Sequence, residues 1–157
     1  MISCTEFILA YNELFKFLDK KYGKKAVVDF WIYVSDNFLT NLDRLVKEKG
    51  IAGMAEYWTH TLTEEKAEYR MDVGENYFRI YMKQCPSVGL LNKSGVEKYP
   101  CYCEHCETLY KRIIERYGFT YKINYIDRDK GVCSIEIVKN EKSPRTPLSK
   151  GGKRGRI

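Results

Sequence analysis

The sequence predicts an α+β fold, in which N-terminal helices precede a ββαββ unit that forms an antiparallel sheet with helices packed on it. Two observations support this class. Apolar residues recur every three to four positions as far as Lys66, and the period then changes to two. The alternating stretches come in two pairs, and a short turn-forming segment separates the members of each pair. We therefore expect one α+β domain over residues 1–140 and a basic tail over residues 141–157.

Three helices are expected in the first half of the chain. The first places these apolar side chains on one face, before a stop at Gly23: Phe7, Tyr11, Leu14, Phe15 and Leu18. The second continues the same period from Val27 to Gly50, and the polar residues 35–37 can divide it because their side chains compete for backbone hydrogen bonds. The third begins at Ile51 and ends near Lys66.

Two hairpins and one helix are expected to complete the domain. The first hairpin has strands near residues 68–73 and 77–85, around a turn at 74–76. The second has strands near 119–126 and 132–138, around a turn at 127–131. A helix is expected near 103–117 between the two hairpins. Residues 87–100 contain glycines and no clear period, and they are expected to form a loop.

The net charge of +6 is concentrated in the tail, where residues 141–157 have a balance of +5. The rest of the chain does not have the composition of a nucleic-acid-binding surface, and the tail is expected to be disordered. No apolar run approaches the ~20 residues of a membrane span. The expected partner is a small molecule. Binding to a membrane or to nucleic acid is not expected, and the sequence is compatible with a homo-oligomer. Closely spaced cysteines without an export signal favour the reduced cytoplasm.

The groups that bind metals or attack carbon are concentrated in one segment: Cys85, Cys101, Cys103, His105 and Cys106. Cys103 and Cys106 share a helix face in a first turn, where the helix dipole favours thiolate. One prediction is a site for zinc or iron, built by Cys85, Cys103 and Cys106 with either His105 or Cys101. The other is a metal-free thiol site, with Cys85 and Cys106 as catalytic residues. The structural alternative is that Cys103 and Cys106 have no chemical role.

Two further groups of residues are candidates for chemistry or binding. Glu56, His60 and Glu64 share one helix face, and we expect His60 and Glu64 to act as an acid/base pair; a solvated charged face is the alternative. Substrate contacts are expected from Trp58, Arg79 and Tyr81, although Trp58 also fits the core. Cys133 alternates in phase with two isoleucines and is expected to be a small buried hydrophobe.

Three stretches resemble the L-2-amino-thiazoline-4-carboxylic acid hydrolase family: Trp58 to Glu65, Cys85-Pro86, and Tyr102 to Cys106 with the following Leu109-Tyr110. The order of elements, with Cys133 in the last strand, is also similar to vinyl-reductase-type ligand-binding domains. The first resemblance implies a small cytoplasmic hydrolase that acts on a cyclic C–N bond and, in the namesake reaction, opens a thiazoline ring with water. The alternative is a non-catalytic small-molecule-binding or metal-sensing domain.

Overall fold

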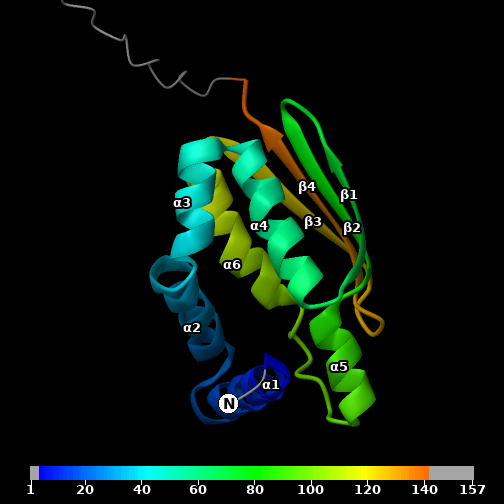
Figure 1. Ribbon diagram of the computed structural model, residues 1–157. Helices are drawn as coiled ribbons and strands as arrows, with labels where there is room; N and C mark the ends of the chain where they lie inside the picture. Colours follow the sequence, from blue (N-terminus) through cyan, green and yellow to red (C-terminus); the bar gives the residue numbers. More distant parts are fainter. Residues whose placement is uncertain (1–3, 142–157) are drawn as a thin grey trace, which may run out of the picture.

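The computed structural model describes residues 4–141, so almost all of the predicted basic tail lies outside the described residues. Four helices, a β-hairpin, two more helices and a second hairpin follow one another along the chain (Figure 1). Their order is α1 (Cys4–Tyr22), α2 (Lys24–Asn37), α3 (Thr40–Lys49), α4 (Ile51–Glu64), β1 (Glu68–Val73), β2 (Tyr77–Gln84), α5 (Pro86–Ser94), α6 (Glu104–Arg116), β3 (Phe119–Asp127) and β4 (Val132–Lys139). The α+β class is confirmed. None of these helices has both the length and the apolar character that crossing a bilayer requires.

The four strands form one antiparallel sheet in the order β1-β2-β4-β3. The second strands of the two hairpins are therefore neighbours at the centre, and Ile80 of β2 lies opposite Ile135 of β4. Alternate side chains make one face of the sheet apolar, as the period of two predicts. Figure 1 shows α4 and α6 on that face. The face contributes these buried residues to the core: Phe78, Ile80, Met82, Phe119, Tyr121, Ile135 and Ile137.

The helices pack against one another through a close backbone contact between α3 and α4 and a hydrogen bond between α2 and α6. The predicted division near residues 35–37 is present, since α2 ends at Asn37 and α3 begins at Thr40. Between α3 and α4, a Cβ placed on Gly53 would lie 2.1 Å from the carbonyl oxygen of Leu45, so only glycine permits this approach. Ser35 Oγ donates a hydrogen bond of 2.8 Å to the carbonyl oxygen of Leu109, which ties α2 to α6.

The expectation of a loop over residues 87–100 holds for residues 95–100 but is wrong for residues 87–94, because Pro86–Ser94 form helix α5. Pro86 occupies the start of the helix, where a missing N–H costs nothing and its fixed φ suits the first turn. Val88 and Leu91 are buried, and Gly95 ends the helix with φ 66°. The proline that ends β2 therefore also begins a helix.

Two apolar cores lie next to each other, and Cys85 packs against both. The larger lies between the sheet and its covering helices, and the smaller joins α1, α2 and α5 to the segment before α6. Asn12 holds that segment: its amide donates to the Glu97 carbonyl oxygen at 2.9 Å, and its Oδ1 accepts the Tyr99 N–H at 2.8 Å. The cysteine-bearing residues 101–103 are thereby fixed against α1.

Candidate functional site

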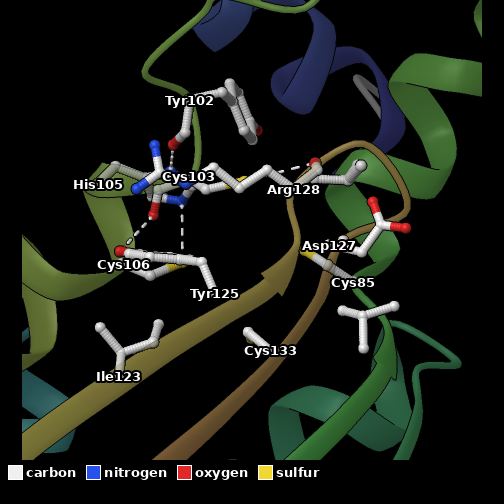
Figure 2. Close-up of a pocket in the computed structure, with 13 residues that line it drawn as sticks. Cys85, Tyr102, Cys103, His105, Cys106, Ile123, Tyr125, Asp127, Arg128 and Cys133 are labelled. Carbon is white, nitrogen blue, oxygen red and sulfur yellow. Dashed lines mark hydrogen bonds between the residues drawn. The ribbon is translucent and has the colours of Figure 1, made fainter.

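A small cavity lies where the two cores meet, between the start of α6, the end of β2 and the β3–β4 turn (Figure 2). Its volume is about 30 Å³, which is room for about two water molecules. The wall is almost entirely apolar in accessible area. Four thiols and one imidazole belong to its lining: Cys85, Cys103, His105, Cys106 and Cys133. The structure therefore brings the four predicted metal ligands and Cys133 together at one cavity.

The β3–β4 turn closes this cavity because of three local interactions. The Cys85 N–H donates to the Gly131 carbonyl oxygen at 2.8 Å, which joins the end of β2 to the turn. A Cβ placed on Gly131, whose φ is 69°, would lie 2.8 Å from the Cβ of Cys85, so glycine is needed at this approach. Asp127 Oδ1 accepts the N–H groups of Asp129 and Lys130 at 3.0 Å each, which folds the turn.

Cys106 and His105 form a hydrogen-bonded pair, with 3.5 Å between Cys106 Sγ and His105 Nε2. The other ring nitrogen, Nδ1, is hydrogen-bonded to the main-chain carbonyl oxygen of Tyr102. Because a carbonyl oxygen only accepts, Nδ1 carries the proton, and a neutral ring then presents an unprotonated Nε2 to the thiol. The Cys106 S–H therefore donates to His105.

The surroundings of His105 keep its ring neutral. Its centroid lies 4.9 Å from that of Tyr102, 6.1 Å from Phe15 and 6.3 Å from Trp31. Removal from water lowers the pKa of His105, while the bond to Tyr102 and the negative charge of Glu65 oppose this change. At pH 7 the imidazole is thus free to accept a proton.

Removal from water raises the pKa of all four cavity thiols, to about 11 for Cys85 and Cys103 and to about 12 for Cys106 and Cys133. This corrects the expectation of thiolates at the start of α6, because desolvation outweighs the helix dipole. Cys133 points inward as predicted, but it lines the cavity and is only partly buried. At neutral pH the four sulfur atoms are protonated, so a nucleophile among them needs a base.

Arg128 and Tyr125 form the rim of the cavity. The guanidinium carbon of Arg128 lies 4.4 Å from the ring centroid of Tyr125, and Nη1 is 3.4 Å from Glu104 Oε1. The Tyr125 hydroxyl donates to the Cys103 carbonyl oxygen at 3.1 Å. Positive charge therefore stands beside an apolar interior. Neither residue is among the site residues expected from the sequence, although alternation in the second hairpin places Tyr125 opposite Cys133.

Zinc or iron does not fit the side chains as they are arranged. Within residues 4–141, no group of three or more His, Cys, Asp or Glu side chains has a geometry that could hold a metal ion. Both ring nitrogens of His105 are engaged, one by Tyr102 and one by Cys106. We therefore derive no chemical step through a metal. Cys101 does not line the cavity; it interacts instead with Lys24 and Glu104.

The predicted acid/base pair is not brought to the thiols. His60 and Glu64 are exposed on α4, and neither lines the cavity. Glu56, in the same helical stripe, forms a salt bridge of 2.6 Å with Lys49. This placement is that of the solvated face considered as the alternative.

The three expected substrate contacts also lie away from the cavity. Trp58 is 3% exposed in the core, where its ring centroid is 5.2 Å from that of Phe78. Arg79 and Tyr81 line a hollow on the other face of the sheet, and Arg79 Nε lies 2.8 Å from Glu136 Oε1. The pairing leaves the guanidinium of Arg79 already engaged.

No family profile, curated protein or solved structure matches this chain. The similarity to thiazoline hydrolases therefore rests on the quoted residues alone. Of those residues, Cys85, Tyr102, Cys103, His105 and Cys106 line the cavity, whereas Trp58 to Glu65 do not.

Proposed function

We propose that this protein is a small-molecule hydrolase that acts on a cyclic C–N bond, with Cys106 as the nucleophile and His105 as the base. The observation that supports the proposal is the 3.5 Å contact between Cys106 Sγ and the unprotonated Nε2 of His105. A neighbouring base activates a nucleophile whose own pKa is too high for it to ionise. The substrate class rests on the resemblance to thiazoline hydrolases.

In the proposed reaction, the Cys106 sulfur adds to the carbon of a C=N bond, and the thiol proton passes to His105 Nε2. In 2-amino-thiazoline-4-carboxylate the electron pair of the C=N bond moves to nitrogen during this addition. It reforms the C=N bond as the ring C–S bond breaks, and the imidazolium gives its proton to the departing ring sulfur. Water, activated by the neutral imidazole, attacks the same carbon and releases the product and the thiol. The Tyr102 carbonyl oxygen holds Nδ1–H throughout, so Nε2 stays directed at the sulfur.

The size of the cavity adds a requirement to this proposal. Room for about two water molecules is too little for a five-membered ring. The Arg128 side chain is 45% exposed and lies on Tyr125, so these two side chains can move without disturbing the core. We infer that they open to admit the substrate and the hydrolytic water, and then exclude bulk solvent from the reacting sulfur.

The direct test is turnover of 2-amino-thiazoline-4-carboxylate to N-carbamoyl-cysteine by the full chain and two serine variants. Cys106→Ser is expected to lower kcat at least ~1000-fold, because a serine hydroxyl is a much weaker nucleophile than a thiol at neutral pH. Cys101→Ser is the matched control, since this neighbouring cysteine lies outside the cavity, and it should keep activity within about twofold. Equal turnover by the two variants would rule out Cys106 as the nucleophile.

A second function, a non-catalytic domain that binds a small apolar molecule, is favoured by the apolar wall and the four protonated thiols. His105→Gln distinguishes the two functions. A binding domain should keep most of its affinity for the ligand in this variant, because only one of the lining side chains changes. A hydrolase should lose turnover.

Binding of zinc or iron by the cysteine cluster remains a prediction from the sequence. Metal analysis of protein purified anaerobically tests it. Stoichiometric metal that disappears in Cys103→Ser and Cys106→Ser would show that the side chains rearrange around an ion. Metal-free protein with full turnover would support the thiol mechanism.

A further inference from the structure

The apolar stripe of α1 is not the face that this helix buries against α2 and α5 (Figure 1). Of the five apolar residues that recur at helical spacing in the sequence, only Phe15 is buried. Phe7 is 53% exposed and Tyr11 is 37% exposed. A polar residue, Asn12, is fully buried instead, and its side chain holds the segment before α6. Much of the apolar surface of α1 therefore points away from the smaller core.

We call the exposed part of this surface the outer stripe, which consists of Phe7, Tyr11, Leu14 and Leu18. Successive helix residues are ~100° apart, so these four side chains lie within about 60° of one another. No charged residue of Cys4–Tyr22 falls in that sector. The stripe is thus a continuous apolar surface along most of the helix.

Exposed aromatic side chains widen the outer stripe on both sides. Phe17 borders it on one side and is 54% exposed. On the other side, the ring centroid of Phe30 in α2 lies 6.2 Å from that of Tyr11, and Tyr33, one turn further along α2, is 64% exposed. At 150–250 Å² for each aromatic side chain, the exposed parts of Phe7, Tyr11, Phe17 and Tyr33 amount to roughly 400 Å². That is about half of what one partner buries in a standard protein interface, before the leucines are included.

The charges beside the outer stripe differ between the two ends of α1. Glu6 lies in the first turn, and Lys20 and Lys21 lie in the last. Lys21 Nζ lies 5.4 Å from the ring centroid of Phe17 and 5.2 Å from that of Tyr22, so the ammonium stands at the edge of the apolar surface. By helix geometry, Glu6 and Lys21 are on the same flank of the stripe. An antiparallel copy of α1 would bring each acidic end beside a basic end, whereas a parallel copy would place like charges together.

We propose that the outer stripe is the interface with a second copy of this chain, in which the two α1 helices pack antiparallel about a two-fold axis. Such an interface requires a surface that is complementary to itself. The axis passes between Tyr11 and Leu14, so that Phe7 of each copy packs against Leu18 of the other. Antiparallel helix dipoles add to the match between the charged ends. A bilayer surface fits less well, because α1 has as many acidic residues as lysines, three of each.

Sedimentation equilibrium of the full chain tests this interface. Wild-type protein should reach the mass of two chains at micromolar concentrations, and Phe7→Glu should raise the Kd of the dimer at least ~100-fold, because it buries two unpaired carboxylates. Tyr11→Glu should have the same effect, and circular dichroism checks the fold of both variants. Phe38→Glu is the matched control, since Phe38 is a 74% exposed aromatic residue at the end of α2, and it should remain dimeric. A monomeric wild type, or a dimer that persists in both stripe variants, would overturn the proposal.

Charge reversal tests the antiparallel arrangement. Glu6→Lys and Lys21→Glu should each raise the Kd of the dimer on the order of tenfold, and the double variant should recover most of the wild-type affinity. A parallel dimer would show no such recovery, and this result would contradict the arrangement. Wild-type protein that stays monomeric but sediments with phosphatidylserine vesicles, and loses this binding in Phe7→Glu, would replace the second copy by a bilayer as the occupant of the stripe.

Discussion

In the sequence, the clusters around His60 and His105 are both candidates for catalytic chemistry. In the structure, the surroundings of the two histidines differ. His60 is exposed on α4, beside a stripe whose Glu56 is already paired with Lys49 at 2.6 Å. His105 is partly buried among aromatic rings and is hydrogen-bonded at both nitrogens. The difference teaches that enclosure and a directed hydrogen bond, more than residue type, distinguish a candidate reactive pair from a solvated face.

The largest expected effect separates the two histidines by activity. His105→Gln should lower kcat for thiazoline hydrolysis by about 10²–10⁴-fold, the usual contribution of a general base. His60→Gln should stay within about twofold, because its side chain does not line the cavity. Circular dichroism of both variants checks that the fold is kept. Comparable losses in the two variants would break the comparison.

The contrast between an enclosed and an exposed side chain also applies to two of the expected substrate contacts, Trp58 and Arg79. Here the quantity that should differ is the free energy of unfolding. Trp58→Ala should lower the free energy of unfolding by about 3–5 kcal/mol, because it leaves a cavity in the core. Arg79→Ala should cost no more than ~1 kcal/mol, since its salt bridge with Glu136 is exposed. Urea denaturation at pH 7 measures both. A Trp58 variant as stable as the Arg79 variant would mean that Trp58 is not part of the core.

Burial of the Cys106 thiol also predicts how the free energy of unfolding changes at alkaline pH. The pKa of Cys106 is raised to about 12 in the fold. Above the ordinary thiol pKa the unfolded chain loses protons that the folded chain keeps. The thiol therefore stabilises the fold below about pH 9, and this contribution is lost as the pH rises toward 12.

Urea denaturation between pH 8 and 11 checks this prediction by comparing Cys106→Ala with wild type. The stability of wild-type protein should fall more steeply with pH than that of Cys106→Ala, by up to ~1.4 kcal/mol per pH unit. If the slope were the same in Cys106→Ala and wild type, the Cys106 sulfur would not be desolvated.

The smallest effect concerns the turn between α4 and β1, where Lys66 has a left-handed backbone with φ 53°. Lys66→Gly should relieve the left-handed strain but add chain entropy to the unfolded state, for a net gain of about 0.5–1 kcal/mol. Thermal unfolding measures the change. A loss of stability would mean that the lysine side chain makes a contact that outweighs its backbone strain.

Most of the fold is predictable from the sequence, because the face that each helix or strand buries sets the spacing of its apolar residues. The change of period after Lys66 located both hairpins to within about one residue at each strand end. Helix α5 is not predicted from the sequence, because a proline at position 86 fits the end of a strand as well as the start of a helix. Its helical role depends on Val88 and Leu91 finding partners in the smaller core, and no local pattern contains that information.

The candidate site was predictable in its residues but not in its chemistry. Helix geometry favours Cys103 and Cys106 as partners, because successive helix residues do not face each other. In the first turn of α6, however, the His105 ring folds back to the Tyr102 carbonyl oxygen and leaves Nε2 beside Cys106. The raised thiol pKa values likewise depend on desolvation by packed residues distant in sequence, which the spacing of cysteines does not encode.

The measurement that tests the central claim most directly is site-resolved mass spectrometry of protein quenched with acid during turnover of 2-amino-thiazoline-4-carboxylate. A covalent nucleophile predicts a substrate-derived mass on the peptide that contains Cys106, and this mass should be absent from Cys106→Ser. Cys101, on the adjoining segment, should remain unmodified. Turnover with no adduct on Cys106, or with the adduct on Cys101, would contradict the account.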